Sequence, residues 1–205
     1  MIQTLVDEIR KAMDNDLLLV ALSAALTLPD VCGKVAFPDE QSSRVRYVNW
    51  FEDEIGQYEK SPHHDGVEMP YISGKVLYSL RCSFLHSGNP SIDNSQLERN
   101  HELPIDHFSL KREKKNQFNI YGDIREVSTN GVKTERSYTM SIRRICMIIC
   151  DVAEAYYLEN KERFHFDCDV IDWEKITSQF PEPNMDEIYD YWARDTKGRK
   201  DTKEV

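Results

Sequence analysis

Hydrophobic residues at spacings of three and four predict helices through the N-terminal part of the chain. The first is expected over residues 4–13. A second is expected through LLLVALSAALTL, with Asn15 or Asp16 as its cap and Pro29 at its end. Because this segment is apolar nearly all round, it should lie in the middle of the core. The next segment, DVCGKVAFPDEQ, is expected to be a loop.

Two further helices are expected before the pattern changes. Ser42 or Ser43 is a suitable start for the third. Pro70 suits the first position of the fourth, which should run to about residue 86. Gly88 and Pro90 would end it. The packed face of the third helix is predicted from residues at helical spacing: Val45, Val48, Trp50, Phe51, Ile55 and Tyr58.

The following stretch, at about 105–140, is rich in β-branched and aromatic residues and predicts a small β insertion. Its runs are HFSLK, QFNIYGDIREVST and VKTERSYTM. Asn130-Gly131 separates the last two runs, and this dipeptide between two strands indicates a hairpin.

Helical periodicity returns over residues 141–164, with short helices expected at 173–180 and 185–192. The predicted fold class is mainly α, a helical bundle with a small β hairpin or sheet inserted before the last long helix. Residues 1–195 are expected to form one domain, and 196–205 a disordered tail.

Composition supports a soluble globular protein, since 40% of the 205 residues are hydrophobic and 30% are charged. No window is expected to supply the ~18 continuous apolar residues of a membrane span. The N-terminus lacks the basic start and apolar centre of a signal peptide. We therefore expect a cytoplasmic protein with no membrane partner.

The net charge of −10 argues against a protein that coats nucleic acid over its whole surface. The charge is uneven, however. Residues 103–144 hold 9 Lys and Arg against 5 Asp and Glu, a local net charge of +4. If a phosphate backbone is a ligand, this sequence pattern favours the middle of the chain, including LKREKKN and IRR.

No metal or cofactor site is expected. The five cysteines form no C-x-x-C pair, so buried free thiols are favoured over a zinc site. His63, His64 and Asp65 are adjacent in SPHHDG, but adjacent side chains point in different directions and no further ligand is close in sequence. The acids of WFEDE are most simply a solvated helix face. The sequence also contains no nucleotide-binding glycine loop and no G-x-S-x-G element.

The stretch LYSLRCSFLHSGNP carries an arginine and a histidine inside an apolar run. On a helical wheel, Arg81 and His86 are about 140° apart, at the two edges of the core-facing arc. One copy is therefore not expected to bring them together tightly, whereas two copies across a two-fold axis could form one cleft. A structural role is the alternative: Arg81 would pair with an acid, and His86 would stabilise the helix C-terminus.

This Arg–four residues–His element resembles the signature of the HEPN superfamily. The resemblance covers about fourteen residues closely and the order of helices loosely. It implies a helical, commonly dimeric protein. Many members are metal-independent ribonucleases, often toxins or phage-defence proteins, and others only bind. Cys82 departs from the Asn, Asp or His that often follows the arginine.

The resemblance implies that Arg81 and His86 are catalytic, with RNA as substrate and a second copy or an antitoxin as partner. The residue chemistry agrees, because RNA cleavage without a metal needs a base, an acid and a cation. Imidazole side chains titrate near pH ~6.5 and serve either proton-transfer role. Guanidinium groups bind phosphate oxygens in a planar fork. The alternative is a non-catalytic HEPN-like interaction or RNA-binding protein.

Overall fold

The computed structural model describes residues 1–59, 70–88, 105–113, 120–128, 132–165, 184–186 and 188–190. The chain divides into two units, Met1–His165 and Phe166–Val205. In the second unit, helical residues are described at 185–186 and 188–190, where a short helix is predicted. The segments 173–180 and 196–205 lie outside the described residues, and one domain over 1–195 stays a prediction.

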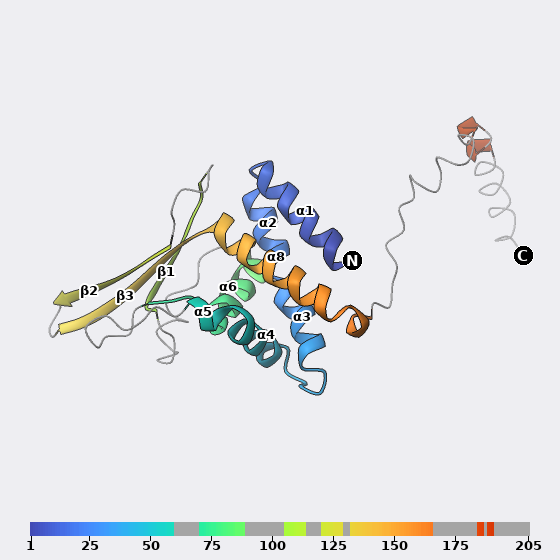
Figure 1. Cartoon of the computed structure of the whole chain (residues 1–205). Helices are drawn as coiled ribbons and strands as arrows, with labels where there is room; N and C mark the ends of the chain where they lie inside the picture. The colour runs from blue at the N-terminus through green and yellow to red at the C-terminus, as the bar shows by residue number, and fades with distance from the viewer. Residues whose placement is uncertain are drawn as a thin grey trace, which may run out of the picture. The chain divides into compact units, whose positions relative to one another are not determined.

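The first unit is mostly helical, as predicted, and carries one small sheet (Figure 1). Its helices are α1 (Ile2–Asp14), α2 (Leu18–Ala25), α3 (Leu28–Ala36), α4 (Ser43–Phe51), the π-helical turn η1 (Glu52–Gly56), α5 (Gln57–Glu59), α6 (Gly74–Ser87), α8 (Ile142–Glu159) and the 3₁₀ turn η2 (Lys161–Arg163).

The expected cap of the second helix is wrong. Leu17 precedes α2 and makes no capping hydrogen bond through its side chain. Asn15 instead turns its amide back onto the Lys11 carbonyl, at 2.8 Å, and Asp16 adopts a left-handed backbone with φ 58°. Both polar residues therefore serve the end of α1, which Asn and Asp do well because they tolerate such turns.

Pro29 lies in the first turn of α3, so the loop predicted after it is wrong over residues 30–36 and confirmed over residues 37–41. Proline has no N–H to lose at that position, and Leu28 and Cys32 are fully buried. Leu18–Ala36 is apolar and long enough to cross a membrane, but it forms two helices and half of it is buried, as core helices of soluble proteins are. The central-core prediction holds for one face only, since Leu19 and Val20 are exposed.

The starts of α4 and α6 are set by serine caps. Ser42 accepts a hydrogen bond from the Val45 N–H, which confirms the predicted start of α4. The fourth predicted helix begins at Gly74 rather than at Pro70, because Ser73 caps the Val76 N–H at 3.2 Å. Gly88 follows α6 with φ 63°, a left-handed position that suits glycine, so its predicted end is confirmed.

The β insertion is a three-stranded sheet with strand order β1-β3-β2. Strand β2 (Ile120–Ser128) pairs antiparallel with β3 (Val132–Ser141), as the hairpin prediction requires. Strand β1 (His107–Lys111) adds in parallel to the other edge of β3. Asn130-Gly131 lies outside the described residues. Because β3 leads directly into α8, the sheet is joined to the end of the bundle's longest helix (Figure 1).

Helix α8 crosses the bundle and packs against α1, α2 and α3. Its buried residues repeat at helical spacing: Ile142, Ile145, Cys146, Ile149, Cys150 and Ala153. Cys32, Cys146 and Cys150 are buried free thiols, as predicted, and burial raises the pKa of each.

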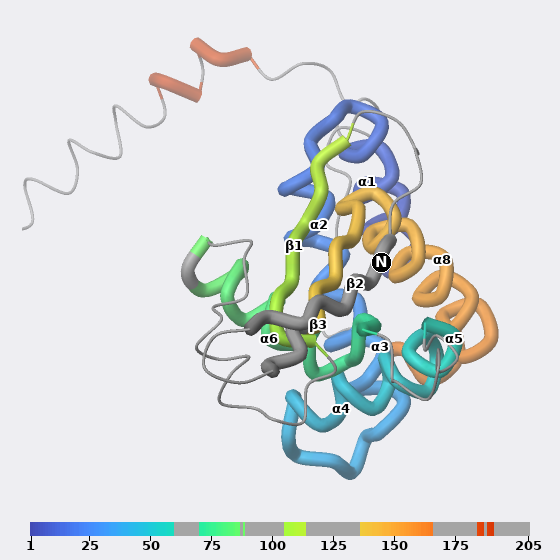
Figure 2. Tube along the Cα trace, turned by 90° about the vertical axis from the view of Figure 1, so that its left-hand side faces the viewer, coloured from blue at the N-terminus to red at the C-terminus, as the bar shows by residue number. Residues whose placement is uncertain are grey.

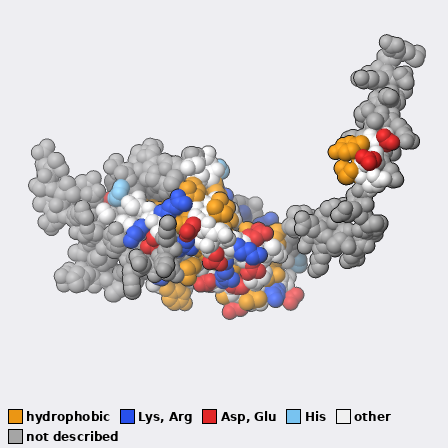
Figure 3. Space-filling view, turned by 90° about the horizontal axis from the view of Figure 1, so that it is seen from above, with side chains coloured by type: hydrophobic (Ala, Val, Ile, Leu, Met, Phe, Trp, Pro, Cys, Tyr) orange, Lys and Arg blue, Asp and Glu red, His pale blue; other side chains and the backbone are white. Residues whose placement is uncertain are grey.

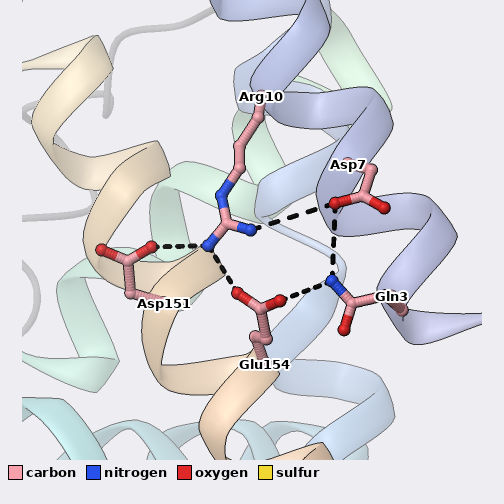
Figure 4. Close-up of polar contacts among 5 residues, drawn as sticks. All are labelled: Gln3, Asp7, Arg10, Asp151 and Glu154. Atoms are coloured by element: carbon pink, nitrogen blue, oxygen red, sulfur yellow. Dashed lines mark hydrogen bonds and ion pairs between the residues drawn. The ribbon is translucent and has the colours of Figure 1, made fainter.

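A polar cluster joins the outer sides of α1 and α8 (Figure 4). Arg10 donates to Asp151 at 2.8 Å and to Glu154 at 2.6 Å. Gln3 also donates to Glu154. The Arg10 and Gln3 hydrogen bonds lower the pKa of the Glu154 carboxyl. Its carboxylate form is therefore favoured in the folded protein.

Candidate functional site

Helix α6 places Arg81 and His86 at its solvent-facing C-terminal part. Val76, Leu77 and Leu80 are fully buried and fix the orientation of the helix against the core. Arg81 is then half-buried and His86 is exposed in the last turn. Figure 2 shows α6 at the same end of the bundle as α3 and α4.

The structure pairs Arg81 with Asp30, in the first turn of α3. The Arg81 Nε and Nη2 atoms each lie 3.0 Å from Asp30 Oδ2. Burial alone would lower the pKa of Arg81, but Asp30 and Cys82 together raise it. Burial raises the pKa of Asp30, against the opposing effect of Arg81 and Arg46. The ion pair holds the guanidinium plane in one orientation.

One copy is not expected to bring Arg81 and His86 together tightly, and their contact lies at the long limit of a hydrogen bond. Arg81 Nη1 lies 3.5 Å from His86 Nε2, although the residues are about 140° apart around the helix axis. The Arg81 side chain is long and flexible, so its guanidinium reaches the His86 ring in the last turn of α6. The contact therefore joins the side chains of the two candidate residues at the C-terminal end of α6.

Tyr78 lies one helical turn before Arg81, and the guanidinium groups of two arginines lie near its ring. The Arg81 Cζ atom is 5.8 Å from the ring centroid, and the Arg44 Cζ atom of α4 is 6.0 Å from it. The Tyr78 ring also meets the buried Tyr47 edge-on, with centroids 5.3 Å apart. These contacts place the face of α6 that carries Tyr78 partly against α4 rather than in open solvent.

Close packing of α3 on α4 brings Asp30 into this site. A Cβ atom at Gly33 would lie 2.7 Å from the Arg46 carbonyl oxygen, so only glycine allows the approach. Tyr47 is fully buried and donates to the Leu26 carbonyl at 3.3 Å. Burial raises the pKa of Tyr47. Tyr47 is therefore uncharged, and it supports the site by packing in the core rather than by contacting a ligand.

Of the three helices that form the site, α4 and α6 carry cations and no acids, and the acid Asp30 comes from α3. Helices α4 and α6 contain Arg44, Arg46, Lys75 and Arg81, with no Asp or Glu between Ser43 and Phe51 or between Gly74 and Ser87. Elsewhere acidic and basic side chains are interspersed, as on the face shown in Figure 3. The α4–α6 surface is therefore locally cationic on a chain of net charge −10.

The basic stretch 103–144 is different, because its described arginines at 136, 143 and 144 have carboxylate partners. Arg136 pairs with Asp106 at 3.2 Å and Arg144 with Glu59 at 3.8 Å. Arg143 pairs with Asp16 and also donates to the Met13 carbonyl at 2.6 Å and the Glu113 carbonyl at 3.0 Å. Arg136 therefore ties β3 to the start of β1, whereas Arg143 and Arg144 tie α8 to α1, to α5 and to the segment after β1.

The remaining sequence candidates do not gather at the site. His63, His64, Asp65 and His101 lie outside the described residues, and His107 is exposed on β1 beside Ser109. Glu52 of WFEDE is not simply solvated, since it accepts a hydrogen bond from the Gly74 N–H at 2.7 Å. Across the described ranges, no group of three His, Cys, Asp or Glu side chains is placed to hold a metal ion.

Sequence patterns did not identify Asp30, Arg44 or Tyr78 as members of the site. Asp30 follows Pro29, and the combination of a proline with an acid in a first helical turn could have indicated α3. The sequences of α4 and α6 each lack Asp and Glu, although the acidic turn η1 directly follows α4. Comparisons with protein-family models, curated proteins and solved structures found no match for this chain.

Proposed function

We propose that this chain is a HEPN-like protein that cleaves RNA without a metal ion, in a toxin or defence role. The observation that carries the proposal is the 3.5 Å contact between Arg81 and His86 at the open end of α6. Arg81 is held in place by Asp30 and lies beside the exposed imidazole of His86. These two side chains provide the phosphate-binding and proton-transfer groups that RNA cleavage needs.

In the proposed reaction, His86 removes the proton of a ribose 2′-hydroxyl, and the 2′-oxygen attacks the neighbouring phosphorus. The bond from phosphorus to the 5′-oxygen breaks, and a protonated imidazole of a second copy, or water, supplies the proton to that oxygen. Arg81 stabilises the charge on the phosphate oxygens. Asp30 positions Arg81 and does not touch the substrate.

The test is cleavage of a mixed RNA pool in EDTA by the wild type, His86→Ala and His107→Ala. His107 is the matched control, because it is an exposed histidine on β1, outside the site. Loss of the proton-transfer group should slow cleavage about 10²–10⁴-fold in His86→Ala only. Products should end in a cyclic phosphate, and a DNA analogue should remain intact.

Equal cleavage by the wild type and His86→Ala would contradict the assignment. No cleavage by the wild type over a broad RNA pool would reject catalysis. It would leave the second candidate, a non-catalytic RNA-binding or interaction protein. That role is favoured by one observation: two of the Arg81 nitrogens already contact Asp30, as expected of an arginine that supports the fold.

The proposed partner is a second copy of the chain, joined across a two-fold axis near α6. Leu85 is 37% exposed, so the end of α6 retains apolar surface beside His86. A dimer there would place two Arg81–His86 pairs in one cleft. Light scattering should give twice the monomer mass of 24.0 kDa. A monomer at high micromolar concentration would contradict this assembly. A cytoplasmic location and a regulatory or antitoxin partner belong to the same proposal.

A further inference from the structure

Arg44 has the features of a ligand-binding cation that the Arg81–His86 pair does not use. It is exposed on α4, and it forms no ion pair with any carboxylate of the described residues. Its one described contact is with the ring of Tyr78. The arginines 10, 81, 136, 143 and 144 each pair with a described Asp or Glu.

Tyr78 links Arg44 to the proposed catalytic site. Both guanidinium carbons lie within 6.0 Å of the same ring centroid, so they are no more than about 12 Å apart. Cations spaced along a groove, with an aromatic ring between them, are the usual means by which proteins follow a single nucleic-acid strand. The ring also restricts where the flexible Arg44 side chain lies.

The charge distribution favours a polyanion over a small anion at this surface. Arg81 already has the charge of Asp30 beside it. A single phosphate bound at Arg81 would therefore leave the positive charge of Arg44 without a negative partner. A second phosphate of the same strand would bind Arg44 while the first stays at Arg81. The absence of acids along α4 and α6 reduces the repulsion that a phosphate chain would meet, which then comes mainly from Asp30 of α3 beside Arg81.

We propose that Arg44 binds a second phosphate of the same strand, so that the bound polynucleotide runs from Arg81 across Tyr78 onto α4. This inference rests on the proposed RNA-directed function for its substrate. It adds a binding residue on α4 that sets which part of the strand lies next to His86. Arg44 contributes to binding and not to the chemical step.

The test is binding of a fluorescent 2′-O-methyl oligonucleotide, which cannot be cleaved, at several salt concentrations. Arg44→Ala should weaken binding about tenfold at low salt and reduce the slope of log K against log salt by about 0.7. Arg44→Lys should restore most of both, because the charge is retained. Arg112→Ala is the matched control, an exposed arginine after β1. It should bind like the wild type, and thermal melting should show all three variants folded.

Three outcomes would overturn the inference: equal binding by Arg44→Ala and the wild type, an equal loss in Arg112→Ala, or no binding by the wild type. If the Arg44 effects appear while RNA is never cleaved, the inference stands and only the catalytic proposal fails. If cleavage occurs, Arg44→Ala should raise KM and leave kcat nearly unchanged. A loss confined to kcat would also reject the binding role.

Discussion

The basic stretch at residues 103–144 and the α4–α6 surface are two cationic regions that differ in how their charges are paired. The first has more positive charge in sequence, a net +4, and would be chosen from composition alone. Arg136, Arg143 and Arg144 of this stretch nevertheless bind carboxylates or carbonyl groups of the chain itself. The second has fewer cations but no acids on its two helices, and Arg44 there has no described carboxylate partner.

The difference shows that local net charge is a poor guide to a binding surface. A cation that already has a carboxylate partner binds a phosphate less strongly, because the phosphate repels that partner, and this holds for Arg81 beside Asp30 as well as for the arginines of the basic stretch. A cation beside an aromatic ring keeps its charge available to a ligand. The pairing of each side chain therefore matters more than the count along the sequence.

Among substitutions of the cations compared above, the largest effect should follow loss of Arg81 in the α4–α6 region. Arg81→Ala removes the group that binds the reacting phosphate, and it leaves Asp30 half-buried without its partner. We expect RNA cleavage to fall about 10²–10³-fold, which is typical for loss of one charge-stabilising group. Initial rates would measure this. Arg81→Lys should recover only part of the rate, because the planar fork is lost. Full recovery would mean that charge alone is enough.

A substitution in the basic stretch should instead affect folding. Arg143→Ala removes hydrogen bonds to Asp16, Met13 and Glu113, and should lower the free energy of unfolding by about 2–3 kcal/mol. Urea denaturation would measure this loss. Oligonucleotide binding by the folded variant should be unchanged. A clear loss of binding without a loss of stability would reverse the comparison.

The ion pair between Arg10 and Glu154 can be tested through the dependence of protein stability on pH. The pKa of Glu154 is lowered in the folded state, so this pair stabilises the protein above the usual Glu pKa. That contribution is lost as pH falls through the lowered value. Glu154→Gln should therefore cost stability at neutral pH, by less than about 1 kcal/mol, and the difference should shrink in acid. Melting curves over this pH range would measure it. A difference independent of pH would indicate lost packing instead.

The smallest effect is expected for the exposed cations at the end of β1. Lys111→Ala with Arg112→Ala removes two charges from the basic stretch, where Lys111 already lies 3.8 Å from Glu113. We expect oligonucleotide affinity to change less than about twofold, because no ligand contact is assigned there. Fluorescence titration would detect a larger change, and a tenfold loss would assign the sheet to the binding surface.

The sequence predicted the elements whose signals are local. Ser42 as a cap, Gly88 as a helix end, the hairpin pairing of β2 with β3 and the long helix before residue 160 follow from side-chain chemistry and periodicity. Pro29 was misread because proline both ends and begins helices. Only the burial of Leu28 and Cys32 in the folded protein shows that Pro29 begins a helix here rather than ending one.

The sequence also identified Arg81 and His86 as the candidate pair, but tertiary structure decided their surroundings. Angular spacing on a helix locates Cβ atoms, not the ends of long side chains, so the contact of Arg81 with His86 was not predicted. Asp30 and Arg44 join the site because α3 and α4 pack closely at Gly33 and α4 packs beside α6. Such pairings depend on residues far apart in sequence, and no local pattern encodes them.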